Sequence, residues 1–203
     1  KRIMNLAQIA VDAYKAVPEV LDHLSPQART FVLLRARAVK ADGGDVADIA
    51  ADYHSKITAA LLTYFEGGSA TGPRNAMRRA AVESLGAAFD LGWTDGGQDL
   101  PPDGDALDWL NARVEQEMGY IGQLFEQIKE LRKEEDIDPL AWVSAKADAY
   151  AAASREAYNA ARMYAKKNQM LTWQYGDTDH CATCEGLNGQ RHKASWYLSR
   201  NYI

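Results

Sequence analysis

The feature that most constrains the fold is a regular spacing of apolar side chains after residue 105. Seven of them follow one another at steps of three or four residues: Leu107, Leu110, Val114, Met118, Ile121, Phe125 and Ile128. This near-heptad pattern places one apolar stripe along a long helix, which favours packing against another long helix. We therefore expect a helix that begins at Asp105 and pairs with the helix that follows it.

The same periodicity, interrupted by glycine and proline, predicts further helices. Earlier helices are expected over residues 4–16 and 26–40. A helix capped by Asp45 has the stripe Ile49, Tyr53, Ile57, Leu61 and Tyr64, and a later helix that ends near residue 92 has Met77, Ala81, Leu85 and Phe89. Asp138-Pro139 begins a last helix that ends near Lys167. Its alanines, at positions 145, 149, 153, 157 and 161, allow a neighbouring helix to approach closely.

We therefore expect a mainly α protein: a multi-helix body with one long helical hairpin, then a small α+β C-terminal module that contains a Cys-x-x-Cys turn. The predicted division is an N-terminal helical region (1–93), a loop (94–104), the hairpin (105–169) and the module (170–203). The loop TDGGQDLPPDG is too rich in Gly, Pro and Asp for a helix or strand. Alternation of Leu171, Trp173 and Tyr175 with polar residues predicts a strand, and Gly186 and Gly189 predict a compact loop after Cys181.

The charge is unevenly distributed. The chain has 23 Lys and Arg against 28 Asp and Glu, a net charge of −5, of which residues 1–165 hold −7 and residues 166–203 hold +2. An acidic body argues against a protein that coats nucleic acid. No apolar run reaches the roughly 20 residues that cross a bilayer. The start, Lys1-Arg2-Ile3-Met4, continues directly into amphipathic sequence, so we expect no signal peptide, and its first residue suggests processing or trimming.

Catalysis has little support in the sequence. It contains no Gly-rich phosphate loop, no Gly-x-Ser-x-Gly elbow and no His-Glu-x-x-His. The four histidines are scattered, and His54 lies in a helical pattern where a structural role is expected. We therefore expect that the protein is not an enzyme.

The two cysteines, Cys181 and Cys184, have a spacing that lets two thiolates bind one metal ion. His192 is the best nitrogen ligand nearby because it is distant enough to fold back across the turn, and zinc is therefore a candidate cofactor. The fourth ligand would come from His180, Asp179 or Glu185. Three other interpretations stay open. His192, between Arg191 and Lys193, is part of a solvated basic cluster without metal. The cysteines are small buried residues without metal, or they form a redox pair, which the expected absence of a helix at Cys181 disfavours.

Basic and aromatic residues gather in the same C-terminal segment. The basic candidates for contact with DNA are Lys166, Lys167, Arg191, Lys193 and Arg200. The aromatic residues Trp173, Tyr175, Trp196 and Tyr197 have the chemistry to stack on bases. We prefer the interpretation that these aromatic residues form the core of the small module.

Residues 157–190 resemble the C-terminal part of the phage Mu F-type minor head proteins, the phage head morphogenesis family. The resemblance rests on three pieces in succession. They are the helix end EAYNAAR (156–162), the strand LTW (171–173), and the segment DTDHCATCEGLNG (177–189), which contains Cys-x-x-Cys and closes on Leu-x-Gly. Many family members continue into a His-Pro-x-Cys-x-Cys segment that would complete a zinc site, and the 203 residues end before such a segment.

The resemblance implies a minor structural protein of a tailed-phage head, associated with the portal and acting in head morphogenesis and genome packaging or delivery. Its expected partners are the portal protein, other head proteins and packaged DNA, bound without sequence specificity, in a multimeric assembly. Its expected location is the virion head, and the host cytoplasm during assembly. Two alternatives are a helical zinc-binding module that contacts nucleic acid, and the head domain of a larger protein with a C-terminal toxin.

Overall fold

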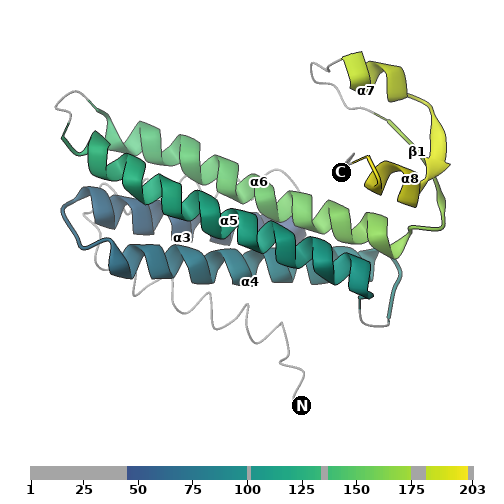
Figure 1. Cartoon of the computed structure of the whole chain (residues 1–203), viewed down its shortest axis with the longest axis horizontal. Coiled ribbons are helices and arrows are strands. Elements are labelled where there is room, and N and C mark those ends of the chain that lie inside the picture. Colours follow the sequence, from purple (N-terminus) through teal and green to yellow (C-terminus); the bar gives the residue numbers. More distant parts are fainter. Residues whose placement is uncertain (1–44, 100–101, 134–136, 175–181, 201–203) are drawn as a thin grey trace.

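Four long helices of the described residues lie side by side in an elongated bundle, with a small C-terminal module beyond the end of the last one (Figure 1). The structure is a computed structural model, which describes residues 45–99, 102–133, 137–174 and 182–200. The elements, in order, are α3 (Asp45–Phe65), α4 (Thr71–Asp95), α5 (Gly104–Leu131), α6 (Pro139–Ala165), β1 (Met170–Thr172), α7 (Ala182–Leu187), β2 (Arg191–Lys193) and α8 (Ala194–Leu198). The helices expected over 4–16 and 26–40 lie outside the described residues.

The mainly α fold class is confirmed, and most of the predicted stripes are buried. Tyr53, Ile57 and Leu61 of α3 are fully buried, as are Met77 and its stripe partners on α4. Burial of such stripes against neighbouring helices is the main source of helix stability in a bundle, because isolated helices are marginal in water.

The backbones of α4 and α6 come into direct contact. A Cβ atom placed on Gly92 would lie 2.1 Å from the carbonyl oxygen of Tyr158, and one on Gly96 would lie 2.3 Å from the Cβ atom of Ala165. The α6 side of this contact is lined by small buried residues, Ala157 and Ala161. Only residues without a bulky side chain permit this approach, so the pair depends on glycine in α4 and alanine in α6.

The alanine face expected on α6 is correct only for its second half. Ala153, Ala157 and Ala161 are buried, whereas Ala145 and Ala149 are exposed. Each residue of a helix advances by about 100°, so alanines four residues apart drift around the axis by about 40° at each step. The buried face at the start of α6 is therefore formed by other residues, among them Val143, Ala147 and Ala151.

The helices α3 and α5 flank the α4–α6 pair on opposite sides, with α5 in front in Figure 1. Of the stripe on α5, Ile121, Phe125 and Ile128 are buried and Leu107 is 43% exposed. The two helices of the expected hairpin are consecutive and antiparallel, but the expected packing of α5 on the helix that follows it is wrong, because α5 packs mainly on α4 and α6 packs mainly on α4 and α3. The two hydrophobic clusters of the bundle both include residues from before and after the loop at 94–104.

The ends of the helices follow the capping residues. Asp138 accepts a hydrogen bond from the backbone N–H of Leu140 at 2.9 Å, with Pro139 in the first turn as expected. α5 begins at Gly104, one residue earlier than predicted, because Asp103 is its N-cap and accepts from Ala106 N–H at 3.2 Å. α4 continues past Gly92 to residue 95, since this glycine lies inside the helix contact rather than at a helix end.

The C-terminal module contains a two-stranded antiparallel sheet of β1 and β2. The compact loop expected after Cys181 is wrong, because Ala182–Leu187 form the short helix α7. Gly186 lies in the last turn of α7, where glycine disturbs a helix least, and Gly189 lies beyond the helix with a φ of 78°. Cys184 therefore lies on a helix rather than in a turn.

Glycine-to-alanine substitutions in α4 test the backbone contact. We expect Gly92→Ala to lower the free energy of unfolding by about 3 kcal/mol, because the new Cβ atom overlaps backbone atoms of α6 that cannot rotate away. Gly86→Ala is the matched control, since a Cβ atom there meets nothing within 4 Å, and it should stabilise the protein by about 0.5–1 kcal/mol. Urea unfolding followed by circular dichroism measures both. Equal effects of the two substitutions would contradict the contact.

Candidate functional site

The β1–β2 ribbon has two different faces. The register pairs Met170 with Lys193, Leu171 with His192, and Thr172 with Arg191. Side chains alternate along a strand, so the middle pair points to one face and the outer pairs to the other. The middle pair is partly buried towards α8, whereas the four side chains of the outer pairs are exposed.

The inner face of the ribbon is covered by an aromatic cluster. Tyr197 is 1% exposed, stacks on Trp173 with ring centroids 5.6 Å apart, and donates a hydrogen bond to the carbonyl of Gln190 at 3.0 Å. The ring of His192 lies 3.7 Å from that of Trp196 and nearly parallel to it, at 9°. The interpretation as core of the module is therefore confirmed for Tyr197, whereas Trp173 and Trp196 are only partly buried and stack around it. Tyr175 lies outside the described residues.

The Leu-x-Gly sequence at the end of the motif has a clear structural role. Leu187 is buried, which fixes α7 against the module. Gly189 has a φ of 78°, a conformation that L residues rarely adopt, and its N–H donates to the carbonyl of Trp173 at 2.8 Å. The glycine thus turns the chain so that β2 returns alongside β1.

Backbone hydrogen bonds join the module to the end of α6. The N–H of Ala194 donates to the carbonyl of Gln169 at 2.9 Å, and the N–H of Ser195 donates to the carbonyl of Lys167 at 3.0 Å. The Lys167 ammonium also forms an ion pair with Asp103, the N-cap of α5. The module is therefore held against the point where α6 ends and α5 begins.

Only part of the candidate zinc site lies in the described part of the chain. Cys181 and the side chain of Cys184 lie outside it. His192 lies inside it, and its Nε2 is 3.0 Å from Oε1 of Gln190, so Nδ1 is the ring nitrogen left for a metal. The residues that the structure describes contain no group of three side chains that could hold a metal ion. Zinc therefore stays a prediction. The sequence argument against a redox pair was the expected absence of a helix at Cys181. That argument no longer holds, because α7 begins directly after Cys181.

The five basic candidates for DNA contact have different surroundings. Lys166 caps the C-terminal end of α6, Lys167 pairs with Asp103, and the Arg200 guanidinium lies 4.1 Å from the ring centroid of Trp196. Arg191 and Lys193 are both exposed on the outer face of the ribbon. The structure thus brings two of the five onto one common surface.

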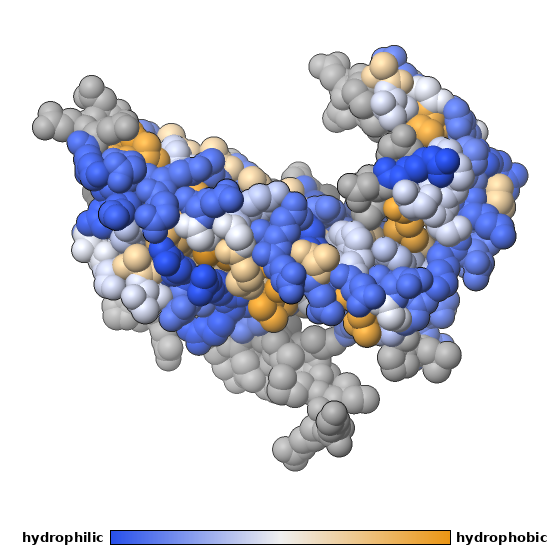
Figure 2. Space-filling model, viewed as in Figure 1, coloured by the Kyte–Doolittle hydropathy of each residue, from blue (hydrophilic) through white to orange (hydrophobic). Residues whose placement is uncertain are grey.

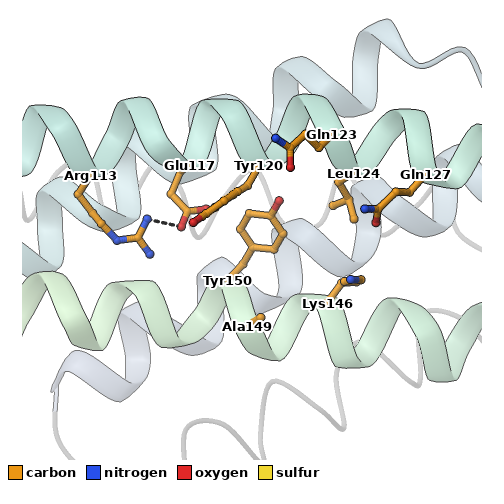
Figure 3. A pocket seen from close by; sticks show the side chains of 9 residues that line it. All are labelled: Arg113, Glu117, Tyr120, Gln123, Leu124, Gln127, Lys146, Ala149 and Tyr150. Atoms are coloured by element: carbon orange, nitrogen blue, oxygen red, sulfur yellow. Dashed lines mark hydrogen bonds and ion pairs between the residues drawn. The ribbon is translucent and has the colours of Figure 1, made fainter.

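A polar groove of about 280 Å³ lies between α5 and α6, and Figure 3 shows the side chains that line it. Arg113 and Glu117 line the groove, and Nη1 of Arg113 lies 2.6 Å from Oε1 of Glu117. Nε of Arg113 lies 3.0 Å from Oε2 of Glu156 on α6. Our sequence interpretation did not include this cluster. A signal was present, because Glu117 stands three residues after Val114 and four before Ile121, inside the apolar stripe.

Glu117 is almost completely buried, with 2% of its surface exposed. Burial raises the pKa of this carboxyl, and the charge and hydrogen bond of Arg113 oppose the rise. Its Oε2 and the hydroxyl of Tyr53 have no hydrogen-bond partner among the described residues. Burial and the nearby Glu117 also raise the pKa of Tyr53 and that of Tyr150, so both phenols stay neutral. The cluster is thus a desolvated ion pair within α5, Arg113–Glu117, and Arg113 extends it to Glu156 of α6, whose side chain is 44% exposed.

Comparison with known proteins adds no relative: no family model, curated protein or solved structure matches the chain. In the described part of the chain, none of the helices has both the length and the apolar character needed to cross a membrane.

Removing the positive partner of the buried pair should destabilise the bundle. We expect Arg113→Met to cost about 3–5 kcal/mol of unfolding free energy, because Glu117 is left buried without a counter-charge. In a Glu117→Gln background the same substitution should cost much less. Lys129→Met, on the exposed side of α5, is the control and should change stability little. Chemical denaturation of the four variants measures these effects, and a cost of Arg113→Met that is independent of residue 117 would contradict them.

The raised pKa of Glu117 also predicts a pH dependence. A carboxyl whose pKa is higher in the folded state contributes stability that is fully present below its unfolded value, about 4.5, and is lost as the pH rises through its folded value. We therefore expect the unfolding free energy of the natural protein, relative to that of Glu117→Gln, to fall as the pH rises above about 4.5. Urea titrations from pH 4.5 to pH 8 measure the difference. A constant or rising difference would show that Arg113 outweighs the burial.

Proposed function

We propose that the protein is a minor structural component of a tailed-phage head, associated with the portal, which acts in head morphogenesis and in genome packaging or delivery. The single observation behind the proposal is the order of motifs from residue 156 to residue 189. The helix end, the Trp-containing strand and the Cys-x-x-Cys segment closed by Leu-x-Gly resemble the phage Mu F-type minor head proteins.

The form of these motifs in the structure supports the proposal. The Trp-containing segment and the Leu-x-Gly segment pair with each other, through the bonds from Trp173 N–H to Gln190 O and from Gly189 N–H to Trp173 O. Tyr197 stacks on Trp173 and donates a hydrogen bond to the carbonyl of Gln190. The described motif residues after α6 therefore belong to one small folded unit, whereas the helix end 156–162 belongs to the bundle.

The helical bundle supplies a long, stiff body for this module. α5 has 28 residues and is therefore about 42 Å long at 1.5 Å per residue. At its beginning, close to the module, Leu107 is 43% exposed, whereas Leu110 and Val114 pack against a hydrophobic cluster of the bundle itself. The surface around Leu107 is the one that we propose for docking on the portal or on another head protein.

The remaining parts of the proposal follow the resemblance. The role is structural rather than catalytic, the protein acts as part of a multimeric assembly in the virion head, and it is present in the host cytoplasm during assembly. Cys181, Cys184 and His192 are the proposed zinc ligands. The alternative of a zinc-binding module that contacts nucleic acid is favoured by one specific observation, the pair of exposed cations on the ribbon.

Quantitative mass spectrometry of purified particles tests the proposal. We expect the chain in particles from the source phage or induced prophage, at a copy number far below that of the major capsid protein and in constant ratio to the portal protein. Particles assembled without portal protein are the control and should lack the chain. Its absence from complete particles, or its presence in portal-free ones, would reject the portal-associated role.

A further inference from the structure

The outer face of the β1–β2 ribbon differs from the rest of the surface in its charge. Arg191 and Lys193 are both exposed there, opposite Thr172 and Met170, and no carboxylate belongs to these two strands. Figure 2 shows mostly hydrophilic side chains along the outer edge of the module. Residues 166–203 hold a net charge of +2, against −7 for residues 1–165. This face therefore presents positive charge on a protein that is otherwise acidic.

The ribbon is built so that these two cations stay in the solvent. Its opposite face is occupied, because Leu171 and His192 point towards the aromatic cluster. A rotation of the ribbon that buried Arg191 or Lys193 would expose that cluster. The other basic candidates are less free, since Lys167 pairs with Asp103 and Arg200 lies on Trp196.

We propose that this face contacts the backbone phosphates of double-stranded DNA through Arg191 and Lys193. The inference rests on the proposed function, because packaged DNA is the polyanion that a head protein meets. The two residues are separated by one position on a strand, so their Cα atoms lie about 7 Å apart. Double-stranded DNA presents one charge per about 1.7 Å of its axis, so phosphates are dense enough for two cations at this spacing to contact separate ones.

The chemistry of the face favours phosphate contact without sequence recognition. Thr172 provides a hydroxyl, and Met170, 50% exposed, is the only large apolar side chain on this face. The tryptophans of the module are stacked on other rings and are therefore not presented to bases. Contact through phosphates alone positions a protein on DNA and reads no sequence.

Fluorescence anisotropy with the full chain and a labelled 20-base-pair duplex tests the contact at several salt concentrations. Release of counterions from two phosphates gives a slope of log K against log[salt] of about −1.8. We therefore expect natural-protein affinity to fall about tenfold between 50 mM and 200 mM NaCl. In Arg191→Ala/Lys193→Ala the slope should become less negative by about 1.8 and approach zero. Thermal melts should be unchanged, because both side chains are exposed.

Arg78→Ala/Arg79→Ala is the matched control. It removes the same charge from exposed positions on α4, in the bundle, and we expect it to leave the slope unchanged. Equal loss in both double variants would show an effect of overall charge and would overturn the inference. Absence of duplex binding by the natural protein at 50 mM NaCl would overturn it as well.

Mass spectrometry of particles assembled in the presence of Arg191→Ala/Lys193→Ala, the ribbon variant, separates this inference from the proposed function. If the duplex is not bound and the variant is lost from particles, the face binds an acidic protein surface, which overturns the DNA contact and keeps the head role. If the natural chain binds the duplex through the ribbon but is absent from particles, the DNA contact stands and the head role falls.

Discussion

The backbone contact between α4 and α6 is the constraint on which the rest of the structure depends. At Gly92 of α4, and at Gly96 just beyond its end, the chain lies so close to α6 that an added Cβ atom would overlap α6. Once these axes are fixed, α3 and α5 can pack on the two sides of the pair, each covering part of the same hydrophobic clusters. The contact lies towards the C-terminal end of α6, so it also fixes the place from which the small module projects.

α5 is attached to this pair by a different kind of interaction. Its apolar stripe is buried mainly in its second half, and the side that faces α6 borders a polar groove. There, Arg113 joins Glu117 to Glu156 across the two helices, in surroundings that leave the Glu117 carboxyl almost without water. A buried ion pair contributes less stability than well-packed apolar residues, but it is costly to break from one side. Only the contact of Arg113 with Glu156 spans α5 and α6, and it adds little to the stability of the bundle because the Glu156 side chain is 44% exposed.

The C-terminal module separates a packed face from an exposed one with very few residues. Tyr197 donates a hydrogen bond to the ribbon from its inner face, and Gly189 turns the chain so that β2 pairs with β1. Two backbone hydrogen bonds join the module to the end of α6. The consequence is a stiff bundle with a small, positively charged face at one end and a partly exposed apolar stripe nearby. These two surfaces suit a protein that holds its place among other proteins and lies against a polyanion, which is the role we propose.

The sequence by itself determined the four long helices of the described residues, their order and several of their ends. Apolar periodicity, Asp138-Pro139 and the glycine-rich loop are local signals, and local signals act through the backbone of a few adjacent residues. Tertiary structure alone decided which face of α6 is buried, that Gly92 lies inside a helix contact, and that Glu117 is buried beside Arg113 and Glu156. It also decided that α7 forms where two glycines predicted a loop, and that Arg191 and Lys193 share a free face while Lys167 does not. Each of these depends on atoms far apart in the sequence, because burial and charge pairing are set by what packs against a side chain and not by its neighbours along the chain.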